Sequence, residues 1–170
     1  IVYAATDSLS LFANYSEGFG MPDVGRALRA IEKPDISLKN FDGFKPIVTD
    51  NVETGFRFKR DKFDFEASYY ESKSKLGERV LAQGDVFVSQ RQRTQIRGVE
   101  VSAGYQINDQ HKINASYAHS EGKYDSNGDG KVDQKFNDLN IPPHRLITDW
   151  SATWYDQWHS YVPANYGFCG

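Results

Sequence analysis

Apolar and polar residues alternate along several stretches of the chain, most clearly between residues 97 and 121. In the first part of this stretch every second residue is apolar: Val99, Val101, Ala103, Tyr105 and Ile107. A polar turn follows at 108–110, and Ile113, Ala115 and Tyr117 then resume the alternation. Because successive side chains of a strand point to opposite faces, the pattern predicts two antiparallel strands joined by a tight turn.

The same pattern predicts seven strands in all, at residues 1–6, 9–15, 47–60, 63–72, 91–107, 111–119 and 144–155. The first, third and fifth connections are two or three polar residues. The second and sixth connections, 16–45 and 120–143, are long, and the fourth, 73–90, is of moderate length. Within the first long connection, Val24–Ile31 is expected to form one or two helical turns.

Connections that alternate between short and long are typical of up-and-down barrels in the bacterial outer membrane, which have short periplasmic turns and long extracellular loops. Residues 99–107 make eight steps of roughly 3.3 Å, which at a tilt of about 40° span roughly 20 Å, close to the apolar band of about 25 Å in such barrels. The sequence therefore predicts an all-β, antiparallel up-and-down meander that forms part of a transmembrane β-barrel.

The distribution of aromatic and charged residues agrees with this prediction. Aromatic residues gather near the short turns, where the inner girdle of a barrel lies: Phe56, Phe58, Phe63, Phe65, Tyr105, Trp154 and Tyr155. Charged residues occupy the opposite parity and would face the lumen: Glu53, Arg57, Asp64, Glu66, Glu100 and Asp149. The alternative is a soluble antiparallel sheet in which these charges form the solvated face.

Composition excludes few classes of protein. The net charge of −3 and the pI of about 5.8 give no basic surface of the kind that nucleic-acid binders carry. The mean hydropathy is −0.64 and no run of 18 apolar residues occurs. Because a transmembrane barrel alternates apolar with polar residues, such values are compatible with a membrane location. The single Cys169 cannot form an internal disulfide.

Four segments resemble, in their order and spacing, the C-terminal half of a TonB-dependent outer-membrane receptor of the ferric-siderophore type: 11–28, 51–72, 96–122 and 137–154. The resemblance implies a barrel of about 22 strands that an N-terminal plug domain fills, with about seven of those strands in this chain. It also implies the partners: a ferric siderophore, the TonB complex acting through a plug that these residues do not include, and outer-membrane lipid. The implied location is the bacterial outer membrane.

Two domain assignments follow. Residues 1–155 are expected to be a partial TonB-dependent receptor barrel, cut from a longer protein at both ends. Residues 156–170 show no alternation and no resemblance to the family, so they are left as an unassigned tail that could be non-native. The alternative functions are another outer-membrane barrel, such as a porin or a receptor for vitamin B12 or a sugar, and a soluble calcium-dependent β-domain.

The first long loop and the strand before it carry side chains suited to an iron chelate. Aromatic and arginine side chains can contact a catecholate or hydroxamate through stacking and charge. On this basis the candidate ligand-binding residues are Tyr15, Phe19, Met21, Arg26 and Arg29. Arg91, Arg93 and Arg97 share the lipid-facing parity at the outer rim, where they would contact anionic headgroups or a chelate, or would simply be solvated.

The second long loop contains the first nine positions of an EF-hand calcium loop. The candidate calcium ligands are Asp125, Asn127, Asp129, the Lys131 carbonyl and Asp133, with Gly130 at the sharp turn. The bidentate glutamate expected at the twelfth position is replaced by Phe136, and no flanking helices are evident. The alternative is a glycine- and aspartate-rich loop that resembles the motif by chance.

No catalytic motif is found in the sequence. Phosphate-binding glycine loops, nucleophile elbows and Cys/His pairs are missing, and His111, His119, His144 and His159 have no metal-ligand spacing. We therefore expect no catalytic residues and no cofactor other than calcium in the 125–133 loop. The expected function is binding and gated translocation of a ferric siderophore.

Overall fold

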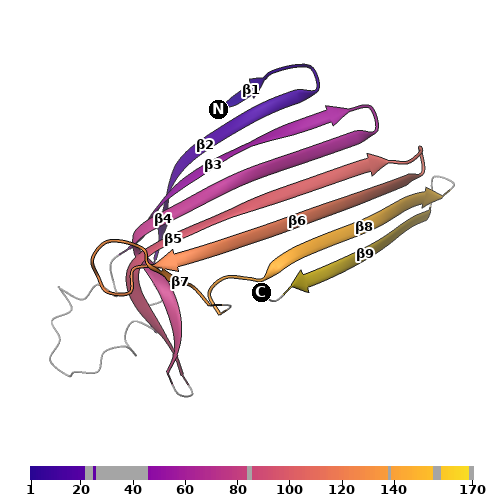
Figure 1. The fold of residues 1–170 in the computed structure, drawn as a ribbon. Coiled ribbons are helices and arrows are strands. Elements are labelled where there is room, and N and C mark those ends of the chain that lie inside the picture. The colour runs from indigo at the N-terminus through magenta and orange to yellow at the C-terminus, as the bar shows by residue number, and fades with distance from the viewer. Residues whose placement is uncertain (22–24, 26–45, 84–85, 138, 155–157, 169–170) are drawn as a thin grey trace.

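The structure of the protein is a computed structural model that describes residues 1–21, 25, 46–83, 86–137, 139–154 and 158–168. The described residues form one curved antiparallel sheet (Figure 1). Its nine strands are β1 (Val2–Ala4), β2 (Leu9–Gly20), β3 (Ile47–Arg60), β4 (Phe63–Gln83), β5 (Val86–Gln106), β6 (His111–Tyr124), β7 (Gln134–Lys135), β8 (His144–Trp154) and β9 (Trp158–Phe168).

The strands follow one another across the sheet in chain order, and the short β7 pairs with the last residues of β6 beside β8. This order confirms the predicted up-and-down meander. One end of the sheet, called the turn end here, carries the tight turns after β1, β3 and β5; the other is the loop end (Figure 1). In the turn after β3, Asp61 has a φ of 51°, the left-handed conformation favoured between twisted strands.

The register places apolar side chains of all the long strands on a common face, called the apolar face. One row across it runs Tyr3, Leu11, Phe56, Ala67, Val101, Tyr117, Leu146 and Tyr166. The neighbouring row on the opposite face, the polar face, runs Phe12, Gly55, Ser68, Glu100, Ala118 and Arg145. The division of the two faces is the one that the alternation predicted.

Exposure of the two faces is the reverse of that in a water-soluble sheet. Along β3 the polar-face residues Asn51 and Glu53 are half-buried, whereas Val52 and Phe56 on the apolar face are exposed. Among the described hydrophobic residues only Tyr124 and Ala152 are buried, and no described side chain is completely buried. A soluble antiparallel sheet covers its apolar face with a core. Within the described residues this sheet has no such core.

Aromatic rings gather on the apolar face towards the turn end, as predicted. The rings of Phe63 and Phe65 lie nearly parallel with centroids 6.3 Å apart, and Phe58 contacts Phe63 at 6.2 Å. Further along the sheet, the His111 ring stacks on Trp150 at 5.5 Å and meets Trp154 edge-on at 5.1 Å. Rings in these positions suit a membrane interface, where one edge is apolar and the other is hydrated.

The prediction of a loop at residues 73–90 is wrong. Strands β4 and β5 continue to pair with each other as far as Gln83 and Val86, past a register shift between Ser74 and Gly77. Figure 1 shows this hairpin extending beyond the rest of the sheet. Its backbone hydrogen bonds do not depend on side-chain polarity. The hairpin is partly covered by the neighbouring end of β6, where the Arg79 guanidinium lies 3.8 Å from the centre of the Tyr124 ring. Its sequence does not show the alternation of residues 99–107.

The predicted strand number is also too low, because the sequence pattern missed β7 and β9. Strand β9 pairs with β8 along its whole length, within the residues 156–170 that the sequence analysis left unassigned. The strand signal is weak here because Tyr161 and Pro163 interrupt the alternation on the polar parity, and because Pro163 cannot donate to a ladder. The helical turns expected at Val24–Ile31 lie, apart from Gly25, outside the described residues.

Candidate functional site

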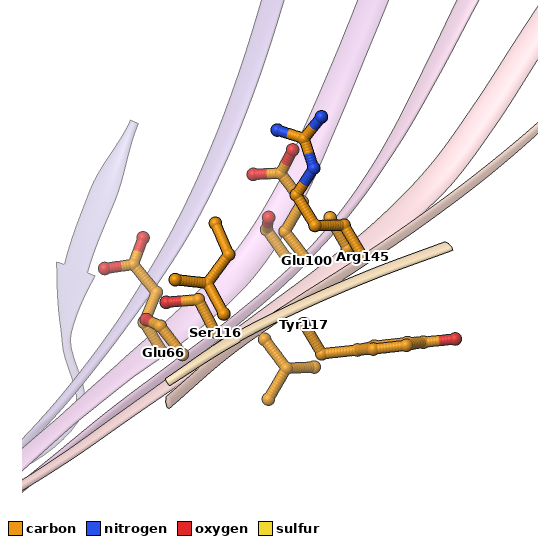
Figure 2. Close-up of a pocket in the computed structure, with 10 residues that line it drawn as sticks. Glu66, Glu100, Ser116, Tyr117 and Arg145 are labelled. Atoms are coloured by element: carbon orange, nitrogen blue, oxygen red, sulfur yellow. The ribbon is translucent and has the colours of Figure 1, made fainter. Parts of the chain in front are cut away.

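The polar face carries a cavity of about 290 Å³ lined by residues of the four strands β4, β5, β6 and β8. Glu66 of β4 and Glu100 of β5 contribute carboxylates, Ser116 of β6 contributes a hydroxyl, and Arg145 of β8 contributes a guanidinium. Figure 2 shows these four side chains on one side of the strands and the Tyr117 ring on the other. The alternation of each strand therefore places charged groups in the concavity and an aromatic ring outside it.

Cross-strand contacts fix the charged side chains next to this cavity. Arg57 Nε donates to Glu66 Oε2 at 2.9 Å, and the Arg57 guanidinium lies 4.8 Å from the centre of the Phe12 ring. On the neighbouring strands, Asn114 Nδ2 donates to Asp149 Oδ1 at 2.8 Å. These contacts join β2, β3 and β4, and β6 and β8, so the polar face presents an ordered array of charges and amides.

Sequence reasoning assigned Glu66 and Glu100 to the lumen side but did not single out this cavity. The missing information was the register, which brings Glu66 opposite Ser102 and Glu100 opposite Ala118. Arg145 lies at the start of β8 and joins the cavity only because Ala118 pairs with it. A residue two strands away cannot be assigned to a site from alternation alone.

The structure does not bring the predicted ligand-binding residues into this cavity. Tyr15 and Phe19 lie on the parity of the apolar face near the loop end, and both are exposed. The Tyr15 hydroxyl donates to Asp50 Oδ1 at 3.0 Å. Met21 is exposed just beyond β2, and Arg26 and Arg29 lie outside the described residues. Their role in ligand binding stays a prediction.

The predicted rim arginines lie on the apolar face beyond the apolar rows. Arg97 follows the row of Val99 and forms an ion pair with Glu121. Arg93 is exposed two rows further along and lines a second cavity with Lys131. The apolar face therefore changes from apolar to charged within two residues, between Val99 and Arg97.

The loop with the EF-hand-like motif is closed by its own hydrogen bonds. Asp125, which is buried, accepts from the Gly128 and Gly130 amides at 2.7 Å each. Asp129 and Asp133 accept from the backbone of Lys131 and Ser126. Within the described residues no group of three His, Cys, Asp or Glu side chains is arranged to hold a metal. Calcium binding by this loop stays a prediction.

Asp133 offers a test of this loop geometry. The Ser126 backbone N–H and hydroxyl donate to its carboxylate at 2.9 and 2.8 Å, and the hydrogen bonds lower the pKa of Asp133. These hydrogen bonds therefore stabilise the loop fully at pH values above the ordinary pKa of Asp. The stabilisation is lost as the pH falls through the lowered pKa of Asp133. In a carbon-13 NMR titration of the side-chain carboxyl, we expect a midpoint below the ordinary pKa of Asp.

The control for this titration is Ser126→Ala, which removes the hydroxyl and keeps the backbone donor. The Asp133 midpoint should then rise part of the way towards its ordinary value. Equal midpoints in the two proteins would contradict the hydrogen-bond geometry.

Two histidines meet on the apolar face where it borders the charged rows. The rings of His119 and His144 have centroids 3.9 Å apart, and the Tyr117 hydroxyl lies 2.8 Å from His144 Nδ1. Their spacing in the sequence gave no sign of this contact, which the β6–β8 pairing creates.

Comparison with known proteins decides the family. The model of the TonB-dependent receptor-like β-barrel family matches residues 1–168. The chain belongs to this family. The match includes β9, so the family extends past residue 155, where the resemblance in the sequence had ended.

Solved structures share the fold of this chain. The copper transporter OprC is 23% identical with a TM-score of 0.70, over 90% of this chain and 23% of its own. The iron transporter FrpB from Neisseria meningitidis is 16% identical with a TM-score of 0.67, over 98% and 25%. P. aeruginosa FpvA in complex with a ferric pyoverdine is 16% identical with a TM-score of 0.59, over 90% and 19%. The chain thus spans a quarter or less of the length of these structures.

Family membership assigns the two faces of the TonB-dependent receptor sheet. Barrels of this family lie in the bacterial outer membrane. The apolar face is the lipid face of such a barrel, and the polar face lines its lumen. The turn end is periplasmic and the loop end extracellular. No helical segment suited to crossing a bilayer occurs in the described part of the chain.

Proposed function

We propose that this chain is part of an outer-membrane receptor that binds a ferric siderophore and takes it up in a TonB-dependent way. Membership of the receptor family supports binding and transport in general. Two of the structures with this fold, FpvA with its ferric pyoverdine and the iron transporter FrpB, favour iron over other cargo. The process needs no covalent chemistry and no catalytic residue.

The main support for the proposal is the charged cavity on the lumen-facing side of the sheet. A polar concave face with Glu66, Glu100 and Arg145 around one cavity gives fixed charges in the interior through which a cargo would pass. The contacts of Arg57 with Glu66 and Phe12 link three neighbouring strands on this face. Side chains beyond the loop end, Met21 among them, would meet a chelate first.

The partners follow from the same proposal. A ferric siderophore enters from the loop end, and the TonB complex acts on a plug domain outside residues 1–170. Arg26 and Arg29 are the proposed cationic contacts for an anionic chelate, and Met21 is a proposed apolar contact. Porin-type diffusion would need no such contacts, and vitamin B12 or a sugar would need no cationic ones.

The test is ligand binding by the full-length protein in detergent. We expect tryptophan fluorescence to be quenched saturably by a ferric catecholate or ferric hydroxamate siderophore, and cyanocobalamin and Cu²⁺ to leave it unchanged. Deleting the gene from the parent strain should abolish growth on that siderophore as the sole iron source. Saturable binding of Cu²⁺ without binding of a ferric siderophore would overturn the proposal. The structural similarity to the copper transporter OprC makes this the main alternative outcome.

The variant Arg145→Gln tests whether the lumen face takes part. We expect slower uptake of the ferric siderophore with an unchanged amount of receptor in the outer membrane. Lys59→Gln removes an exposed cation of the polar face at the turn end, away from the cavity, and is the matched control. Equal uptake by both variants would contradict a role for Arg145.

A further inference from the structure

We propose that the apolar face carries a binding site for the phosphate-bearing headgroup of a membrane lipid, in the cavity between Lys73, Arg93 and Lys131. The site is separate from the lumen cavity because it opens on the opposite face of the sheet. It does not depend on the identity of the transported cargo.

The cavity has a volume of about 350 Å³ and lies between strands β3, β4 and β5 and the loop that follows β6. Asp50, Lys73 and Gln95 form one row across the three strands, on the parity of the apolar face. The backbone segment 130–132 closes the other side, and Val132 also lines the adjoining hollow beside Arg97. The walls are therefore charged although the face below them is apolar.

The charge of the cavity favours an anion. Its lining includes four cations, Lys73, Lys75, Arg93 and Lys131, against the single carboxylate of Asp50 among the described residues. Asp50 already accepts a hydrogen bond from the Tyr15 hydroxyl, and Lys73 forms an ion pair with Glu71. Within the described part of the chain, Lys75, Arg93 and Lys131 have no carboxylate within 4.0 Å. A phosphate, which accepts several charge-assisted hydrogen bonds, would satisfy them together.

The position of the cavity identifies the anion as a lipid headgroup. On β4 and β5 the last apolar residues of this face are Tyr69 and Val99, both partly exposed. Lys73 lies four residues beyond Tyr69, roughly 13 Å along the strand and roughly 10 Å along the membrane normal at a tilt of about 40°. Lysine and arginine side chains at this depth extend to the headgroup layer. Acyl chains on Val99 and a headgroup in the cavity would occupy one continuous surface.

The loop of residues 125–133 explains how Lys131 is held over the cavity. The Asp125 amide donates to the Arg93 carbonyl at 3.0 Å, which anchors the loop to β5. The Asp125 carboxylate binds the Gly128 and Gly130 amides, and both glycines have the positive φ that the turn requires. The aspartates and glycines of the EF-hand-like motif thus shape a turn that presents a lysine.

The experiment measures lipid retention by the full-length protein in detergent with native mass spectrometry. Dioleoyl phosphatidic acid and dioleoyl phosphatidylcholine are added separately, since they share acyl chains and differ in headgroup charge. We expect one phosphatidic acid molecule to bind at least tenfold more tightly than phosphatidylcholine. Arg93→Gln and Lys131→Gln should each weaken its binding about fivefold, the effect of one surface cation on an anionic lipid. Lys59→Gln should leave binding unchanged.

Two further measurements test whether the bound anion is a lipid headgroup or free phosphate, and whether the loop holds Lys131 in place. Inorganic phosphate at millimolar concentration should not displace phosphatidic acid, and Asp125→Asn should weaken retention as Lys131→Gln does. The proposal is overturned if both lipids bind equally, if Arg93→Gln binds as wild type does, or if inorganic phosphate competes without an acyl chain. It is also overturned if retention needs added Ca²⁺, which would make the loop a metal site. Unchanged heat-modifiable migration on gels shows that each variant is folded.

Discussion

Placing arginine at position 101 is expected to destabilise the folded barrel by about 2–4 kcal/mol, the cost of a cation on the lipid face near the bilayer midplane. Val101 lies in the middle row of the apolar face, between Ala67 and Tyr117, and is flanked by apolar rows on both sides. The arginine stem is too far from either interface for its charge to be hydrated without distorting the bilayer. The measurement is equilibrium unfolding by denaturant of full-length Val101→Arg in phospholipid vesicles.

Ser102→Arg is the matched control because it adds the same side chain one residue away. Ser102 lies on the polar face opposite Glu66, where a cation meets water and a carboxylate. We expect a change within about 0.5 kcal/mol, as for ordinary surface substitutions. If the two variants lose equal stability, or if Ser102→Arg loses more, the assignment of the two faces is wrong.

Gly55→Ala is expected to destabilise the barrel by about 1–3 kcal/mol, because the added methyl group has no room. A Cβ atom at Gly55 would lie 2.3 Å from the Ala67 carbonyl oxygen of the neighbouring strand and 2.6 Å from the Phe12 ring. The carbonyl belongs to the ladder and cannot move alone, and the Phe12 ring is held under the Arg57 guanidinium. The same unfolding experiment in vesicles measures the effect.

Gly20→Ala serves as the control for this substitution. Gly20 also lies in a strand, but the nearest atom to its added Cβ would be 3.8 Å away, in Ile47. We expect Gly20→Ala to unfold as the wild type does or at slightly higher denaturant concentration, since alanine restricts the unfolded chain. Equal losses at Gly55 and Gly20 would mean that the backbone, and not the close approach of Phe12 and Ala67, requires glycine.

The membrane-spanning part of the sheet could be predicted from the sequence because two environments act on alternate residues. Lipid on one side and a polar lumen on the other impose strict alternation from Val99 to Ile107, and the tight turn at Asp61 needs only two residues. The β4–β5 extension lies beyond the apolar rows and packs partly on the neighbouring end of β6, where Arg79 covers Tyr124, so lipid does not impose alternation there. In β9, Tyr161 and Pro163 on the polar parity hide the alternation.

The sites depend on register and were less predictable. Alternation assigned Glu100 to the lumen, but Arg145 reaches the same cavity only through pairing of β5, β6 and β8. The motif at Asp125 predicts that its carboxylate is a calcium ligand. In the structure this carboxylate accepts hydrogen bonds from the Gly128 and Gly130 amides, and the Asp125 amide donates to the Arg93 carbonyl. Contacts with residues two strands away, or about thirty residues away in the chain, cannot be recognised from the local sequence pattern.

The most direct test of the membrane assignment is a nitroxide scan of residues 99–106 in the full-length receptor, reconstituted in phospholipid vesicles with Cys169 replaced by serine. Each residue is changed to cysteine and spin-labelled, and electron paramagnetic resonance measures its collisions with lipid-soluble oxygen and with a water-soluble nickel chelate. We predict that oxygen collisions dominate at 99, 101, 103 and 105 and that the nickel chelate dominates at 100, 102, 104 and 106. A profile without period two, or one with the two parities exchanged, would contradict a sheet whose Val101 face is in lipid.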